Sequence, residues 1–205
     1  MDVKPRKLPR QTRAKATVDA IVEATTQVLL EEGYERFTTA RAAERAGVSI
    51  GSLYQYFPNK AALASAVIDR CCENFLIAFE RALAAGPRRV TLAECIRAIV
   101  EVTLLSHHLA PELHRIVLDL APRLGVAERT ETFSRAAAQA IEVMLRKHAD
   151  EIAPDIDIAV AATIVETLLE TLAHRAVSAH PVHLEGDLLA REATRLINSY
   201  LTVSG

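Results

Sequence analysis

One stretch of the sequence, residues 49–60, is rich in side chains that bind anions and contains no carboxylate. Serine and tyrosine hydroxyls donate hydrogen bonds to phosphate oxygens, which an acid on the same surface would repel. A glutamine amide can pair with the edge of a base, and adenine is its best match. A lysine in the first turn of a helix can hold a phosphate together with the helix N–H groups. The side chains concerned are Ser52, Tyr54, Gln55, Tyr56 and Lys60.

Two short helices are expected to present these side chains. Thr38 or Thr39 can cap the first helix, and Ser49 can cap the second. Gly47 between them can adopt the left-handed conformation of a tight turn. Apolar residues at helical spacing can hold the pair to a core, and they include Ala42, Ala43, Ala46, Val48, Leu53 and Phe57. Two short helices joined by a glycine turn form a helix-turn-helix, whose second helix enters the major groove of DNA.

Residues 46–60, AGVSIGSLYQYFPNK, resemble the core signature of the tetracycline-repressor-like (TetR) family of transcription regulators. The similarity covers roughly residues 13–63, where Gly33, Glu44 and Arg45 also fall in the register of the family. The resemblance implies a homodimeric DNA-binding repressor that responds to a small-molecule effector and needs no cofactor. It also implies DNA contacts by Thr38, Thr39, Ser52, Tyr54, Gln55, Tyr56 and Lys60.

Two positions depart from the pattern of the family. Ala42 stands where a large aliphatic residue is usual, and Phe37 could fill the space that it leaves. Arg41 stands where an acid is common, and it could either contact a phosphate or remain in solvent. These departures concern the details of the first short helix and leave the motif itself intact.

The whole chain is expected to be all-α. Half of its 205 residues are apolar, and proline and glycine separate segments whose apolar residues recur every three to four positions. Ile21, Val22, Thr25, Val28 and Leu29 are expected to face the core from the first helix, and Thr91 with Glu94 fits a capping box. About nine helices are predicted, over residues 13–32, 39–46, 50–57, 59–85, 91–107, 111–121, 126–149, 156–179 and 184–202.

The sequence divides into three parts. Residues 1–12 resemble a flexible basic arm, residues 13–60 a DNA-binding domain with its helix-turn-helix at about 38–57, and residues 61–205 a regulatory and dimerisation domain. Residues 1–60 hold ten basic and seven acidic residues, a balance of +3, while the remainder carries −5. This asymmetry fits either a polyanionic partner at the N-terminal end or a solvated tail.

Residues 156–179 and 184–202 are the expected dimer helices. The first is apolar around much of its circumference, so it has two faces to bury. Leu189, Ala193, Leu196 and Tyr200 share a stripe of the second. One face of each helix can pack within the subunit, and the other can meet a two-fold mate or join a fully intramolecular core. A two-fold dimer would read a palindromic operator in double-stranded DNA.

The resemblance also implies an effector cavity among the helices of the C-terminal part. Polar residues on apolar stripes are the candidates to line it: Asn74, Thr103, His107, Thr163, Glu166 and Glu170. Each of them also fits a satisfied polar group of the core, a charge at its rim or a contact of the dimer interface.

The alternatives to a DNA-binding repressor are an enzyme, a helical interaction module and an activator. An enzyme could use His107, His108, His114 and Glu112, but a Pro111 break separates them, and no HExxH, GxSxG or phosphate-binding glycine loop is present. Acids in place of Ser52, Tyr54 or Lys60 would favour a helical interaction module without DNA binding, and none is present. An activator would use the same parts as a repressor.

The remaining composition points to the cytoplasm. No apolar segment follows the basic N-terminus as in a signal peptide, and no run approaches the ~20 apolar residues of a membrane span. Cys71, Cys72 and Cys95 lack metal-type spacing and are expected to be reduced and mostly buried.

Overall fold

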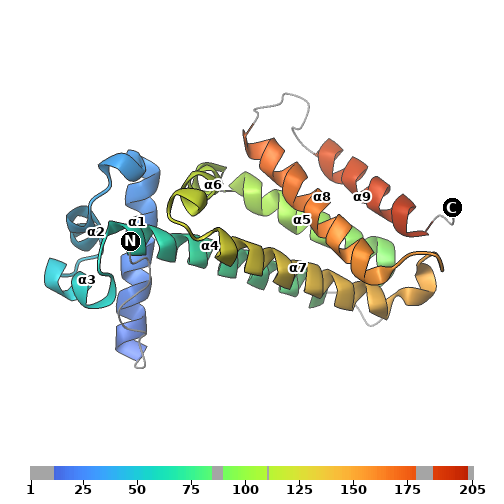
Figure 1. The fold of residues 1–205 in the computed structure, drawn as a ribbon, viewed down its shortest axis with the longest axis horizontal. Coiled ribbons are helices and arrows are strands. Elements are labelled where there is room, and N and C mark those ends of the chain that lie inside the picture. Colours follow the sequence, from blue (N-terminus) through green and yellow to red (C-terminus); the bar gives the residue numbers. More distant parts are fainter. Residues whose placement is uncertain (1–11, 85–89, 110, 179–186, 203–205) are drawn as a thin grey trace. The chain divides into compact units, whose positions relative to one another are not determined.

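A computed structural model describes residues 12–84, 90–109, 111–178 and 187–202 (Figure 1). The described part of the chain is all-helical, as predicted. Its helices are α1 (Thr12–Arg36), α2 (Thr39–Arg45), α3 (Ile50–Tyr56), α4 (Lys60–Ala84), α5 (Leu92–Leu109), α6 (Pro111–Arg123), α7 (Ala127–Lys147), the short 3₁₀ helix η1 (Ala149–Glu151), α8 (Ile158–Ser178) and α9 (Asp187–Thr202). Residues 1–11 of the predicted arm lie outside the described residues.

Most helix ends fall within about two residues of the predicted ones. The C-terminal end of α1 differs more, because the helix extends beyond Glu32 to Arg36, and the predicted start of the last helix at residue 184 lies outside the described residues. Gly33 combines a positive φ with an extended ψ (φ 72°, ψ 166°), a backbone conformation essentially restricted to glycine, so it interrupts α1, and a further turn follows it. The amide of Phe37 closes that turn by donating to the Gly33 carbonyl at 3.1 Å.

The chain forms two compact units. The first contains the residues up to Glu73 together with Glu112–Thr130, and the second contains Asn74–Pro111 and the residues from Glu131 onward. α6 therefore groups with the N-terminal helices, whereas the sequence predicts a regulatory domain over residues 61–205.

The core of the first unit joins α1, α2, α3 and the start of α4. All five α1 residues predicted to face inward are buried. A second cluster in this unit packs Ala64 and Ile68 of α4 against Val117 and Leu120 of α6. Burying a leucine or isoleucine side chain stabilises a fold by about 1.5–3 kcal/mol, so the cluster gives α6 a substantial attachment.

In the second unit, α5 packs against both α8 and α9. Its buried cluster draws residues from five helices, including Phe79, Ile96, Leu145, Leu169 and Ile197. The predicted capping box begins α5: the Thr91 amide donates to the Glu94 carboxylate at 2.9 Å, and the Glu94 amide donates to Thr91 Oγ1 at 3.3 Å. Cys95 is buried here, while Cys71 and Cys72 on α4 are half-buried.

No described helix is both long and apolar enough to cross a membrane.

Candidate nucleic-acid interface

Local hydrogen bonds define the turn between α2 and α3. Thr38, not Thr39, caps α2, since its side chain accepts a bond from the Arg41 amide at 3.3 Å. Gly47 adopts the predicted left-handed conformation (φ 65°), and its amide donates to the Glu44 carbonyl at 3.1 Å. Ser49 caps α3 by accepting from the Ser52 amide at 3.0 Å. The two helices thus meet as the sequence predicted.

Buried apolar side chains hold both helices to the first unit. Ala42 and Ala43 of α2 are buried, as are Leu53 of α3 and Phe57 directly after it. Phe37 lies in the same cluster as Ala42. Both side chains are fully buried, as expected if Phe37 fills the space left by Ala42. One face of α3 is therefore fixed, and the opposite face is presented to solvent.

The solvent face of α3 carries the predicted polar side chains. Gln55 is exposed, and Tyr54 is 41% exposed. The Tyr54 hydroxyl lies 3.0 Å from Thr39 Oγ1 of α2, so two predicted phosphate contacts already share a hydrogen bond. The Ser52 hydroxyl similarly lies 2.8 Å from that of Ser49. Tyr56 is half-buried and packs partly against the core, which leaves less of it available to a ligand.

Lys60 lies at the start of α4 and is half-buried. Its Nζ donates to the backbone carbonyl of Glu35 at 3.2 Å and lies 4.4 Å from the centre of the Tyr34 ring. Asn59 caps the helix, since its Oδ1 accepts from the Ala62 amide at 2.8 Å. The ammonium is thereby held in a defined place beside the N-terminus of α4.

Two arginines of α2 form ion pairs with acids of α1. Arg41 pairs with Glu32 at 2.7 Å, which was neither of the two alternatives that the sequence left open. Arg45 makes a two-bond contact with Glu31, at 2.8 and 2.5 Å, and this hydrogen bonding lowers the pKa of the Glu31 carboxyl. Such exposed pairs are weak and screened by salt, so a phosphate could compete for either arginine.

The predicted effector residues are scattered over the second unit. Asn74 and Thr163 are exposed, and Thr163 donates to the Ala159 carbonyl at 3.1 Å. Thr103 is buried and donates to the Ile99 carbonyl at 2.7 Å. The side chain of His107 lies outside the described part of the structure.

Glu166 and Glu170 are brought together by a serine of α7. Ser134 Oγ lies 2.7 Å from Glu166 Oε1 and 3.1 Å from Glu170 Oε2. Burial raises the pKa of the Glu166 carboxyl, the Ser134 hydrogen bond opposes this rise, and the Glu170 carboxylate adds to it. No sequence pattern points to Ser134, because its contacts join positions on two different helices.

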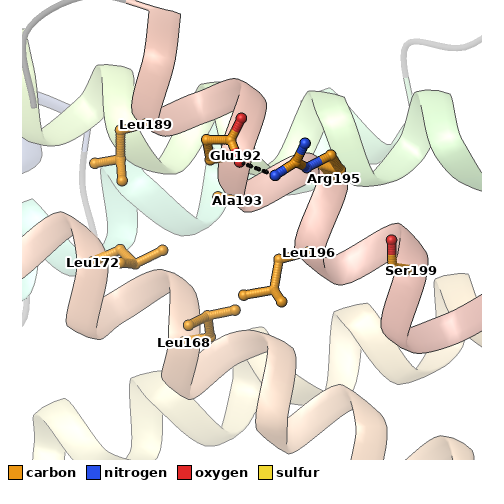
Figure 2. Close-up of a pocket in the computed structure, with 8 residues that line it drawn as sticks. All are labelled: Leu168, Leu172, Leu189, Glu192, Ala193, Arg195, Leu196 and Ser199. Atoms are coloured by element: carbon orange, nitrogen blue, oxygen red, sulfur yellow. Dashed lines mark ion pairs between the residues drawn. The ribbon is translucent and has the colours of Figure 1, made fainter.

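An open apolar groove of about 360 Å³ runs between α8 and α9 (Figure 2). Leu168 and Leu172 of α8 point toward Leu189 and Leu196 of α9, and a Glu192–Arg195 ion pair at 2.6 Å borders them. The surface of α8 continues the apolar character with Val160, 55% exposed, and Ile164, 45% exposed. Each helix thus has a second apolar face besides its buried one.

The stripe predicted on α9 lies at the border of its two faces. Ala193 of that stripe is buried together with Ile197 and Leu201, whereas Leu196 is 56% exposed and lines the groove with Leu189. Among the residues that the structure describes, no three histidines, cysteines or acids are placed to hold a metal ion.

Comparison with known families matches both parts of the chain. Residues 21–67 match the family model described as bacterial regulatory proteins of the TetR family. Residues 91–201 match the model of the tetracyclin repressor-like C-terminal domain, which alone covers more than half of the chain.

Two curated relatives illustrate the similarity in sequence. The nucleoid occlusion factor SlmA of Glaesserella parasuis is 34% identical over 87 residues, or 42% of this chain and 41% of that protein. The HTH-type transcriptional repressor KstR of Mycolicibacterium smegmatis is 38% identical over 66 residues, 32% of each chain. The matched regions thus span well under half the length of these two relatives.

Solved structures share the fold over nearly the whole chain. SmeT, the repressor of the Stenotrophomonas maltophilia multidrug efflux pump SmeDEF, gives a TM-score of 0.69 at 23% identity, with 94% of this chain and 93% of that chain covered. A SmeT–triclosan complex gives a TM-score of 0.67 at 21% identity, with 93% of both chains covered.

Proposed function

Since the chain belongs to the TetR family of bacterial regulatory proteins, we propose that it is a sequence-specific DNA-binding repressor of transcription. The observation that carries this proposal is the face of α3. Leu53 and Phe57 fix one side of the helix in the core, while Tyr54 and Gln55 stand in solvent on a helix without a carboxylate. This is the arrangement of a recognition helix, and the family is one of regulators and not of enzymes.

The side chains of the motif divide into two roles. Thr38, Thr39, Ser52, Tyr54, Tyr56 and Lys60 offer hydroxyl or ammonium donors, which suit phosphates and fix the register on DNA. Gln55 is exposed on the same helix and offers an amide that can read a base edge, so it is the proposed source of sequence preference.

The apolar groove of α8 and α9 supports homodimerisation. Exposed large apolar residues gather on these two helices, and a contiguous apolar surface of this kind is typical of a protein interface. A two-fold dimer carries two recognition helices, so the proposed operator is a palindrome with half-sites one or two helical turns apart.

Repression and response to an effector are proposed from the relatives. KstR and SmeT are both named as repressors, and SmeT has been solved with triclosan. Among the polar candidates whose side chains the structure describes, Glu166 and Glu170 share a partner, Ser134.

Selection of bound duplexes from a randomised pool, at about physiological salt, tests the proposal. An enriched palindrome is the expected result, because base contacts must then exceed the screened phosphate attraction. Absence of enrichment from a folded, effector-free preparation would favour a helical interaction module instead.

One double and one single substitution then separate the two roles. Tyr54→Ala combined with Lys60→Ala should weaken binding to every duplex without changing the oligomeric state. Gln55→Ala should lower discrimination at one base position by about 1–3 kcal/mol while leaving non-specific affinity unchanged. Fluorescence anisotropy with matched and mismatched duplexes measures both, and wild-type binding by the double variant would contradict the assignment.

A further inference from the structure

Two cations from different helices meet at residues 34 and 35 of the first unit. Lys60 begins α4, and Arg123 ends α6. Lys60 Nζ lies 4.4 Å from the centre of the Tyr34 ring and 3.2 Å from the Glu35 carbonyl oxygen. Arg123 Cζ lies 5.5 Å from the centre of the same ring, and Arg123 Nη2 donates to the Glu35 carboxylate at 2.6 Å. Both cations therefore contact the same pair of residues.

The position of this pair depends on α6 as well as on the helix-turn-helix. Gly33 interrupts the helix immediately before Tyr34, so the last turn of α1 takes its own direction. The Tyr34 ring packs partly against the cluster of α1–α3 and partly against the cluster that contains Val117 and Leu120 of α6. The groups that hold Tyr34 and Glu35 therefore also fix the surroundings of the Lys60 ammonium.

The charge of Arg123 is paired with two carboxylates at the surface. Its guanidinium donates to Glu35 at 2.6 Å and to Asp119 at 2.9 Å, and these two carboxylates raise the pKa of Arg123. In return, the Arg123 hydrogen bond lowers the pKa of Glu35, and the charge of Lys60 acts weakly in the same direction. Lys60 is thus a second cation within electrostatic reach of the Glu35 carboxylate.

We propose that Arg123 is a positioning residue for Lys60. By occupying the Glu35 carboxylate from α6, it leaves the ammonium on the Glu35 carbonyl, where it stays available to a DNA phosphate. Without Arg123 the carboxylate would attract Lys60 into an ion pair that competes with the phosphate. The inference rests on the phosphate contact of Lys60 proposed above. It makes DNA affinity depend on a side chain far outside the matched N-terminal region, residues 21–67.

The test is binding of the full chain to a mixed-sequence duplex over a range of salt concentrations, since a phosphate contact acts on every sequence. Arg123→Gln should weaken binding up to about fivefold for each subunit, the range of one exposed ion pair. It should also reduce the salt slope toward that of Lys60→Ala, which loses about one phosphate contact per subunit. Because the pairs of Arg123 are exposed, the variant should fold, and thermal unfolding verifies this.

Three double variants distinguish positioning from a direct phosphate contact by Arg123. In a Lys60→Ala background, Arg123→Gln should cause no further loss, because the residue through which it acts is gone. Glu35→Gln added to Arg123→Gln should restore affinity and salt slope. Asp119→Asn added to Arg123→Gln has the same net charge and should not restore them, so it controls for a general charge effect.

The outcomes separate this inference from the proposed function. Additive losses from Lys60→Ala and Arg123→Gln, or equal rescue by Asp119→Asn and Glu35→Gln, would overturn the positioning role and leave Lys60 as a phosphate contact. Wild-type affinity and salt slope for Lys60→Ala would contradict both the phosphate contact of Lys60 and the positioning role of Arg123.

Discussion

Hydroxyl groups on the recognition surface are paired with one another before any DNA arrives. Tyr54 bonds Thr39 across α2 and α3, and Ser52 bonds the cap residue Ser49. A hydroxyl is both a donor and an acceptor, so each group can keep one of these bonds while it donates another to a phosphate. The pairing reduces the rotamer freedom that binding would otherwise remove.

The ionised form of Glu166 is disfavoured by its surroundings. It is half-buried beside a second carboxylate, and burial raises its pKa above the ordinary value of 4.5. The native state therefore binds this proton more tightly than the unfolded state does. The resulting stability is fully present below about pH 4.5 and is lost as the pH rises through the raised native pKa.

Glu166→Gln should remove the loss of stability that accompanies ionisation of this carboxyl group. The free energy of unfolding of the variant should rise relative to wild type as the pH increases from about 4.5 toward neutrality, because the amide cannot ionise. Urea unfolding at several pH values and one fixed protein concentration measures the difference. Glu80→Gln, an exposed acid on α4, is the control for removal of one charge. A difference that is independent of pH would contradict the assigned role of burial.

Among the elements, the short helices α2 and α3 depend on their connection. Each has only seven residues, which is too short to be stable alone. Caps at Thr38 and Ser49, the turn at Gly47 and the burial of Leu53 together hold them in place. Changes at the turn should therefore act on the whole motif.

Gly47→Val tests the left-handed turn. A Cβ at this position would meet no atom within 4 Å, so any cost comes from the backbone alone. A β-branched residue at φ 65° should lower the free energy of unfolding by about 1–3 kcal/mol. Gly47→Asn should cost clearly less, because asparagine tolerates this conformation. Equal stability of the valine variant and wild type in urea unfolding would show that the turn can adopt another conformation.

For the whole molecule, the paired surface of α8 and α9 carries the proposed dimer. Leu196→Glu would place two like charges into that interface, which costs several kcal/mol and weakens association on the order of a hundredfold. We expect monomers by analytical ultracentrifugation and loss of affinity for the palindromic duplex. Val143→Glu, on an exposed apolar residue of α7, is the matched control and should leave both unchanged. A dimeric Leu196→Glu protein would place the subunit contact elsewhere.

The elements of this protein were predictable from sequence because their determinants are local. A cap residue, a glycine with positive φ and an apolar residue every third or fourth position act over one or two helical turns. These local rules correctly predicted the capping box of Thr91 with Glu94, the turn at Gly47 and the inward-facing residues of α1. The polar face of α3 followed in the same way, since Leu53 and Phe57 determine which side is left to solvent.

Contacts between distant residues were decided only by the tertiary structure. Lys60 meets a carbonyl 25 positions before it, Arg123 meets an acid 88 positions before it, and Ser134 meets acids on α8. The grouping of α6 with the N-terminal helices, and the burial of Ile197 while Leu196 stays exposed on α9, were likewise decided by packing. Such contacts depend on the angle and register at which helices pack, and these arise from the shapes of many side chains at once. The residue types of one segment therefore determined its helices and its candidate DNA surface, whereas packing determined which charges support that surface.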